Sequence, residues 1–176
     1  MFNVLFKIRS ISKLSRKSNI IHHHVLKLIK EDSTFKHNIF FIVDFFVRWN
    51  STYQMLKRFK TLKRIVIALT NSPEEIQGIK LNQSVKLKNW LLSSDEWIIV
   101  DTLEKILFPF FKATELASFQ NYPTLAISLV IKNSLQSHLC MSGSSDEALI
   151  KQILTERLLY HLDTKISKKQ KEYTQV

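Results

Sequence analysis

Glycine, proline and cysteine are scarce in this chain, whose 176 residues include 2 Gly, 3 Pro and 1 Cys. So few breaking residues favour long helices with few tight turns. The single cysteine, Cys140, excludes an internal disulfide and suits a reducing compartment, and a small packed apolar side chain is its simplest interpretation. No apolar run approaches the length needed to span a bilayer, so we expect no membrane partner.

Acidic residues are scarce in the first third of the chain. Residues 1–64 contain 14 Lys or Arg and 3 Asp or Glu, whereas residues 65–176 contain 12 of each, so the whole excess of 11 positive charges precedes residue 65. Clustered positive charge attracts polyanions, chiefly nucleic acid. A solvated basic surface without a partner is the alternative. The acid-free start also imitates a transit peptide, although a helix on a larger core explains it equally well.

Apolar residues at helical spacing make up much of the rest. Hydrophobic residues account for 45% of the chain, enough for a core. Residues 3–14 and 19–30 have the spacing of one bent helix or two short ones. Helices are also expected at about 52–70 and 94–118, with Pro109 kinking the latter. Helix-start patterns of Ser-x-x-Glu or Gln, each typically worth ~1 kcal/mol, occur at Ser51, Ser72, Ser93 and Ser144.

The buried faces of these helices follow from the same spacing. Ile20, Ile21, Val25, Leu26 and Ile29 are predicted to be buried in 19–30. The corresponding set in 52–70 is Met55, Phe59, Leu62, Val66 and Leu69. In 94–118 it is Val100, Leu103, Leu107, Phe110 and Phe111, and Trp90 and Trp97 are also expected in the core.

A run of β-branched and aromatic residues from Ile39 to Phe46 interrupts the helical pattern. It is apolar at every position but Asp44, as in a strand buried on both faces. A buried strand cannot exist alone, because its backbone groups need partners. Nothing else in the chain has a convincing strand pattern. We therefore predict one strand, at about 39–45, whose neighbouring strands are missing from this chain.

The residues that follow this run resemble a known signature. DFFVRWNSTYQMLKRF (44–59) is similar to the Asp-x-x-x-Arg-Trp-Asn-Ser-Thr-x-x-Met-Leu signature of hAT-superfamily transposases and of host proteins derived from them, including BED-type zinc finger proteins. Residues 93–118 resemble the family's Glu-Trp, Leu-x-Pro-Phe, Ala-Thr and Leu-Ser helix, and 122–139 its Tyr-Pro-Thr-Leu helix. Val47 stands where the family usually has Thr, which fits a decayed or domesticated copy.

The resemblance implies a mainly α fold in two parts. Residues 1–50 would be a remnant of a ribonuclease H-like core, with helices and the last strand, and residues 51–176 would belong to an all-helical insertion domain. Transposases of this family are thought to use three carboxylates and two divalent metal ions such as Mg²⁺. We expect the chain to begin after the first two carboxylates and to end before the third. No catalytic residue, metal ligand or cofactor is therefore predicted, and we expect no strand cleavage by this chain alone.

No other metal site is expected. His22, His23 and His24 are consecutive, and helical neighbours point about 100° apart, so they cannot converge on one ion. Asp44 matches the acidic head of the signature, which is not a metal ligand of the family. It is interpreted as a hydrogen-bonded turn residue, with Arg48 as a possible partner.

Six residues are candidates for contact with DNA. Arg48 and Trp49 match the family's Arg-Trp, in which the tryptophan is implicated in stacking on a flipped base, and a stacked base contributes ~1–3 kcal/mol. The alternative for Trp49 is a core anchor between strand and helix. The remaining candidates are the cations of the 52–70 helix: Lys57, Arg58, Lys60 and Arg64.

Two functions remain open. The first is a truncated, nuclear, hAT-type transposase-derived protein with residual DNA binding and no complete metal site. The second is a helical protein-interaction module, such as a domesticated fragment that dimerises or binds other transposase-derived proteins, and binds no DNA. A DNA affinity that falls steeply with salt favours the first function, and no affinity or a salt-independent affinity favours the second.

Overall fold

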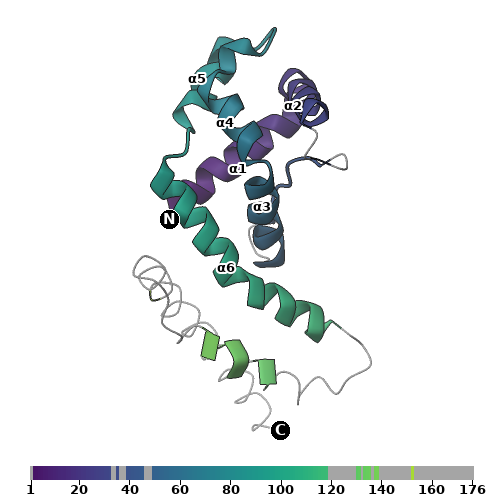
Figure 1. The fold of residues 1–176 in the computed structure, drawn as a ribbon, viewed down its shortest axis with the longest axis vertical. Helices are drawn as coiled ribbons and strands as arrows, with labels where there is room; N and C mark the ends of the chain where they lie inside the picture. Colours follow the sequence, from purple (N-terminus) through teal and green to yellow (C-terminus); the bar gives the residue numbers. More distant parts are fainter. Residues whose placement is uncertain are drawn as a thin grey trace, which may run out of the picture. The chain divides into compact units, whose positions relative to one another are not determined.

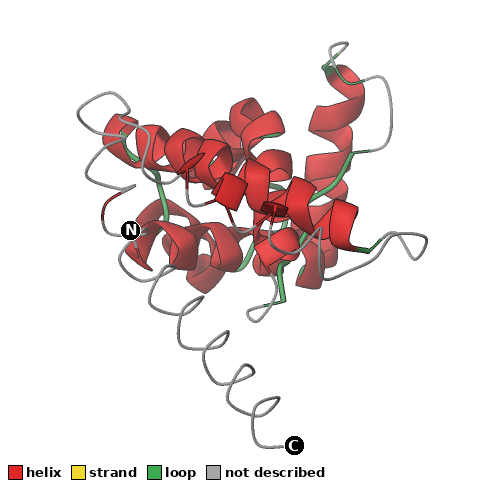
Figure 2. Ribbon diagram, turned by 90° about the horizontal axis from the view of Figure 1, so that it is seen from below, coloured by secondary structure: helices red, strands yellow, loops and turns green. Residues whose placement is uncertain are grey.

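The computed structural model describes residues 2–32, 35, 39–45 and 49–118, and the isolated positions 130, 131, 133–135, 137, 138 and 152. Helices dominate these residues, and no strand occurs among them (Figures 1 and 2). The prediction of a mainly α fold is therefore confirmed. None of the described helices is both long and apolar enough to cross a membrane.

The chain divides into two compact units, Met1–Leu107 and Phe108–Val176. The described elements are α1 (Phe2–Lys17), α2 (Asn19–Glu31), α3 (Trp49–Thr61), α4 (Lys63–Asn71), the 3-10 helix η1 (Pro73–Glu75), α5 (Leu81–Asn89) and α6 (Ser94–Ala117). The boundary predicted at 50/51 falls inside the first unit. Assignment of residues 1–50 to a ribonuclease H-like core stays a prediction.

Apolar side chains at helical spacing form the core of the first unit. Ser18 is extended and separates α1 from α2, so 3–14 and 19–30 belong to two helices. Ile21, Val25 and Ile29 are buried as predicted, but Ile20 is 38% exposed and Leu26 is only half-buried. The set predicted for 52–70 is confirmed, because every member is at most 1% exposed: Met55, Phe59, Leu62, Val66 and Leu69.

The helix predicted at 52–70 is split into α3 and α4 at Leu62. The Thr61 hydroxyl donates to the carbonyl oxygen of Lys57 (2.9 Å), and such a bond back to the preceding turn tends to bend a helix. Leu62 still donates to the Arg58 carbonyl (3.1 Å) and accepts from the Val66 N–H (2.9 Å). The chain therefore changes from α3 to α4 while keeping backbone hydrogen bonds across the joint.

The strand predicted at 39–45 does not form: these residues have no regular secondary structure. The described residues offer no neighbouring strand for pairing, and β-propensity alone does not make a sheet. Phe41 packs against helix α3 instead, whereas Phe45 is 74% exposed. Phe41 is 1% exposed, and its ring centroid lies 6.0 Å from that of Phe59.

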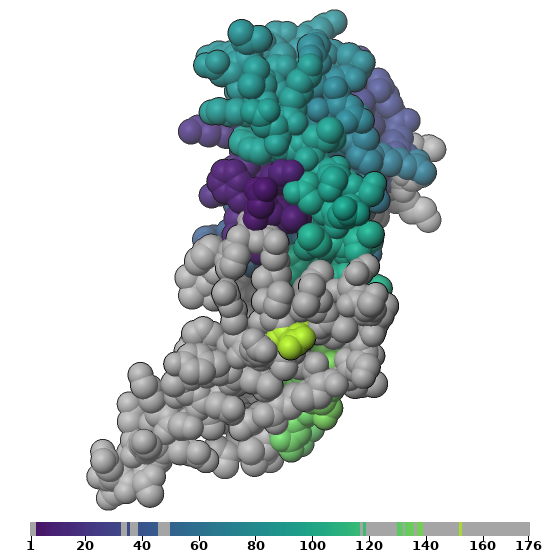
Figure 3. All heavy atoms as spheres, turned by 90° about the vertical axis from the view of Figure 1, so that its left-hand side faces the viewer, coloured from purple at the N-terminus to yellow at the C-terminus, as the bar shows by residue number. Residues whose placement is uncertain are grey.

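The start of α6 has the predicted capping box. The Ser93 N–H donates to Glu96 Oε2 (3.0 Å), and the Glu96 N–H donates to Ser93 Oγ (3.2 Å). Lys7 of α1 donates to the same carboxylate (2.7 Å) and to the carbonyl of Leu91 (3.0 Å). These bonds fix the start of α6 beside α1, as the space-filling view shows (Figure 3).

Other predicted starts differ from the structure. Ser51 lies inside α3 and Ser72 makes no side-chain cap hydrogen bond, because α3 begins at Trp49 and Pro73 opens a 3-10 helix. Ser144 lies outside the described residues. Gly78 adopts a φ of 78°, which permits the turn before α5.

Phe59 is predicted to contribute strongly to stability, because it is 1% exposed and its ring packs on those of Phe41 and Trp97 (centroids 6.0 and 5.6 Å away). Phe59→Ala should lower the free energy of unfolding by about 3–5 kcal/mol. Chemical denaturation followed by circular dichroism measures this loss. Leu81→Ala is the control: Leu81 is 79% exposed, so its substitution should change stability by less than about 0.5 kcal/mol. Equal losses in the two variants contradict the prediction.

Candidate nucleic-acid interface

The carboxylate of Asp44 joins α1, the 39–45 segment and α3. Arg9 Nε donates to Oδ1 (2.9 Å) and Oδ2 (3.1 Å), and Nη2 donates to Oδ2 (2.6 Å). The Thr52 hydroxyl donates to Oδ2 (2.9 Å). The side chains of Arg9 and Asp44 are 21% and 2% exposed. A guanidinium and a carboxylate in this two-pronged geometry form one of the strongest kinds of protein hydrogen bond.

The ion pair shifts the pKa of both partners. Burial raises the pKa of Asp44. Hydrogen bonds from Arg9 and Thr52, together with the attraction of the Arg9 charge, lower this pKa by more than burial raises it, so it lies below its usual 3.8. The hydrogen bond to Asp44 raises the pKa of Arg9, against the opposing effect of burial. Both groups are therefore charged at neutral pH.

Arg9 is the partner of Asp44 that sequence reasoning missed. The interpretation of Asp44 as a hydrogen-bonded residue is confirmed, but Arg48, suggested as its partner, lies outside the described residues. A signal was present in the sequence, because Asp44 is the only acidic residue between Asp32 and Glu74 while α1 is basic and acid-free. A carboxylate isolated in an apolar run needs a cation from elsewhere in the chain.

Side chains also satisfy backbone groups of the 39–45 segment. Arg16 Nη1 donates to the Phe41 carbonyl (3.0 Å). The Ser51 hydroxyl accepts from the Phe45 N–H (3.0 Å) and donates to the Phe45 carbonyl (3.0 Å). Arginine and serine side chains thus make hydrogen bonds that a neighbouring strand would otherwise supply. The segment leading to Arg48 and Trp49 is fixed to α1 before it and to α3 after it.

The Arg-Trp pair itself is described only in part. Trp49 is the first residue of α3, but its side chain lies outside the described residues. Base stacking by Trp49 and its alternative, a core anchor, both stay predictions. Trp97 is 7% exposed and stacks on Phe59 (5.6 Å between centroids), so its predicted place in the core is confirmed.

Of the four cations predicted in 52–70, two contact acidic residues and two form no ion pair with a described residue. Lys60 bonds to Asp101 (3.0 Å) and Glu104 (3.2 Å) of α6, and the hydrogen bond to Asp101 is the main cause of its raised pKa. Arg64 is 79% exposed in its side chain and approaches Asp32 at 3.9 Å. Lys57 is exposed and Arg58 half-buried, and neither forms an ion pair with another described residue.

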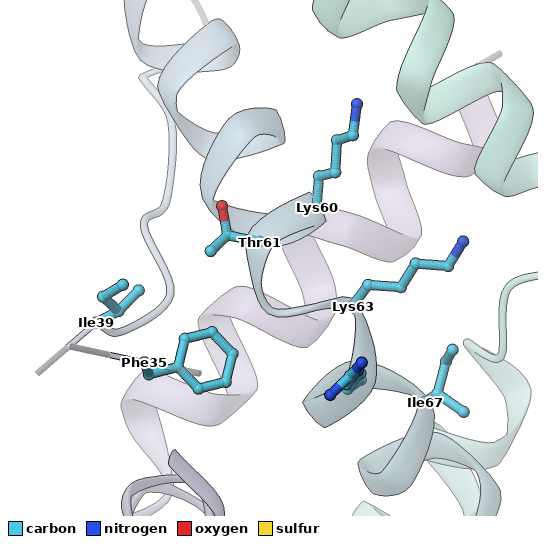
Figure 4. Close-up of a pocket in the computed structure, with 7 residues that line it drawn as sticks. Phe35, Ile39, Lys60, Thr61, Lys63 and Ile67 are labelled. Carbon is cyan, nitrogen blue, oxygen red and sulfur yellow. The ribbon is translucent and has the colours of Figure 1, made fainter. Parts of the chain in front are cut away.

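A groove lies at the joint between α3 and α4. Its volume is about 570 Å³, and Figure 4 shows Lys60 and Lys63 projecting from the joint, with Phe35 and Ile39 on the neighbouring connection. The residues that line it are Phe35, Ile39, Lys60, Thr61, Lys63, Arg64 and Ile67. An apolar floor and a cationic rim suit a ligand that is anionic and partly apolar.

The described residues do not fit the two-metal site of the family. Asp44 is bound to Arg9, and no three His, Cys, Asp or Glu side chains gather at one point within the part that the structure describes. His22 packs on Phe40 (4.2 Å between ring centroids), His23 is exposed and His24 is half-buried. Burial lowers the pKa of His24, which opposes its protonation.

Residues 1–106 match the family model described as the ZBED1 RNase-like helical domain. The match covers more than half of the 176 residues and includes α1 to α5 and the first half of α6. No curated protein and no solved structure matches the chain.

Breaking the Arg9–Asp44 pair should destabilise the first unit. Arg9→Gln should lower the free energy of unfolding by about 3 kcal/mol, the low end of the range for a broken buried pair, because Arg9 is 21% exposed. Denaturation of Arg9→Gln, Asp44→Asn and the double variant gives the coupling energy. Lys27→Gln is the control, since it removes only an exposed pair with Glu31. Strictly additive single losses contradict a direct interaction.

The pair also predicts a pH dependence. The folded state lowers the pKa of Asp44, so this group contributes stability above its ordinary 3.8 and loses the contribution as pH falls through the lowered folded value. The stability difference between the wild-type protein and Asp44→Asn should therefore shrink as pH falls below about 3.8. Denaturation over a pH series measures it, and the shared acidic groups cancel in the comparison. A difference that stays constant from neutral to acidic pH contradicts the prediction.

Proposed function

The chain belongs to the family of the ZBED1 RNase-like helical domain, and we propose that this transposase-derived protein binds DNA without cleaving it. The observation that carries the proposal is the positive charge left on α1 to α4 after ion pairing. Several cations of this region pair with no acid among the described residues: Lys13, Arg16, Lys17, Lys30, Lys57, Arg58 and Lys63. DNA phosphates are the partners that such uncompensated charge favours.

Part of this charge lies along α1. Lys13, Arg16 and Lys17 are three and four residues apart and so share one side of the helix. Arg16 also holds the Phe41 carbonyl (3.0 Å), so this side of α1 adjoins the 39–45 segment. Arg48 follows that segment, and we assign it a phosphate contact and Trp49 a base-stacking role. A nuclear location follows from DNA as the partner.

The two remaining predicted contacts have different weights in this proposal. Lys60 contributes less than its charge suggests, because Asp101 and Glu104 already neutralise it. Arg64 contributes more, because it is 79% exposed and its contact with Asp32 is long at 3.9 Å. We assign no catalytic residue, and Asp44 is held in an ion pair with Arg9.

A protein-interaction module is the second candidate, favoured by one observation on α5. Leu81 and Val85 are 79% and 49% exposed and lie one helical turn apart. Adjacent exposed apolar side chains on one helix favour contact with another protein, which here would be a second transposase-derived protein.

The DNA proposal is tested with Lys57→Glu/Arg58→Glu. The wild-type affinity for a DNA duplex should fall linearly on a plot of log affinity against log salt, and loss of two phosphate contacts should flatten the slope by about 1.8. Fluorescence anisotropy over a salt series measures both slopes. Lys80→Glu/Lys86→Glu is the control, because it makes the same change in net charge on exposed residues at and near α5. Its salt slope should stay steeper than that of Lys57→Glu/Arg58→Glu. Absent or salt-independent binding by the wild-type protein supports the interaction module.

A further inference from the structure

We propose that the groove at the α3–α4 joint holds one nucleotide of a single-stranded nucleic acid, with its base against Phe35 and its phosphate at Lys63 and Arg64. This inference rests on the proposed function and extends it, because it names the form of nucleic acid and a contact site outside the Arg-Trp stretch. The groove exists because the chain breaks at Leu62. The break brings the end of α3 and the start of α4 to one concave surface.

The floor of the groove is apolar and open to solvent. Phe35, Ile39 and Ile67 line it, and all three are half-buried, so each keeps surface that a ligand can cover. The volume of about 570 Å³ lies in the range of sites that enclose small organic ligands. Phe35 supplies an aromatic ring, and every nucleobase has a flat face that stacks on such a ring.

The rim supplies Lys63, which forms no ion pair among the described residues, and Arg64, whose ion pair with Asp32 is long and exposed. The Lys63 ammonium lies 4.8 Å from the Trp97 ring centroid and pairs with no acid among the described residues. Arg64 is 79% exposed in its side chain, and among the described residues the acid that it approaches, Asp32, is 3.9 Å away. Lys60 lines the same groove but bonds to Asp101 and Glu104, so we assign the phosphate to Lys63 and Arg64.

Single strands fit this arrangement better than duplexes. In a duplex the bases are paired and stacked, so a base reaches a protein pocket only after it is flipped out at a cost of a few kcal/mol. A single strand presents unpaired bases and a charged backbone together. An acidic peptide would satisfy the rim, but its carboxylates have no flat aromatic surface to cover Phe35. The combination of ring and cations therefore favours nucleic acid.

The test measures the affinity of the full chain for a labelled oligothymidine of about 12 nucleotides by fluorescence anisotropy. Phe35→Leu keeps an apolar side chain and removes the ring, so it should weaken binding by about 5- to 100-fold, whereas Phe35→Tyr should restore it. Lys63→Gln should flatten the salt slope by about 0.7, the effect of one lost contact on a single strand. Duplex affinity should change less than single-strand affinity in both Phe35→Leu and Lys63→Gln.

Matched controls separate the groove from general effects. Phe6→Ala removes a 59% exposed aromatic ring elsewhere, and Lys86→Gln removes an exposed charge on α5; both should bind oligothymidine as the wild-type protein does. Thermal unfolding by circular dichroism establishes that each variant is folded.

The outcomes distinguish this inference from the proposed function. If Phe35→Leu and Lys63→Gln bind oligothymidine normally while Lys57→Glu/Arg58→Glu weakens duplex binding, the groove assignment is wrong and the proposed function stands. If the wild-type protein binds neither nucleic acid, the proposed function fails first. If an oligoglutamate peptide binds more tightly than oligothymidine, and its binding is weakened by Phe35→Leu, the groove is a peptide site and the nucleotide assignment is overturned.

Discussion

The ion pair between Arg9 and Asp44 is the constraint from which the arrangement of the first unit follows. Burying the Asp44 carboxylate, which is 2% exposed, would destabilise the fold by several kcal/mol if no cation lay beside it. Because Arg9 supplies that cation, α1 must pass close to the 39–45 segment. Thr52 bonds to the same carboxylate and brings the start of α3 to that point. From there α3 directs Phe59 onto Trp97, and α6 joins the same core. One buried charge thus ties together elements that are separated by many residues in the sequence.

Local patterns predicted the helical part of this unit well. The five apolar positions from Met55 to Leu69 are all at most 1% exposed, because a period of 3.6 residues holds wherever a helix has one buried side. The box at Ser93 also formed, since both of its hydrogen bonds are local. The split at Leu62 was not predicted, because neither glycine nor proline marks it. The strand at 39–45 was wrong for a different reason: a strand requires partners, and the described chain supplies arginine and serine side chains in their place.

The candidate site was harder to predict, because its charges are compensated over long sequence distances. The basic pattern of 52–70 predicts the same role, contact with DNA, for Lys57 and Lys60. In the structure, Lys60 forms ion pairs with two carboxylates of α6 that lie more than 40 residues further on. Asp44 likewise found its cation on α1 instead of in its own turn. Pairs of this kind depend on how helices pack, which composition and spacing do not specify. The match over residues 1–106 shows the family, while the individual roles of Arg48 and Trp49 stay predictions.

The bonds of Ser51 to Phe45 have a consequence for solubility. Residues 39–46 form an apolar, β-prone stretch with one charge and no proline, the composition of segments that stack into amyloid-like sheets when their backbone is open. The Ser51 hydroxyl hydrogen-bonds to both the N–H and the carbonyl of Phe45, whose side chain is 74% exposed, and Arg16 donates to the carbonyl of Phe41. These side chains occupy backbone hydrogen-bonding groups that a strand of another molecule would otherwise pair with, and so they oppose edge-to-edge aggregation.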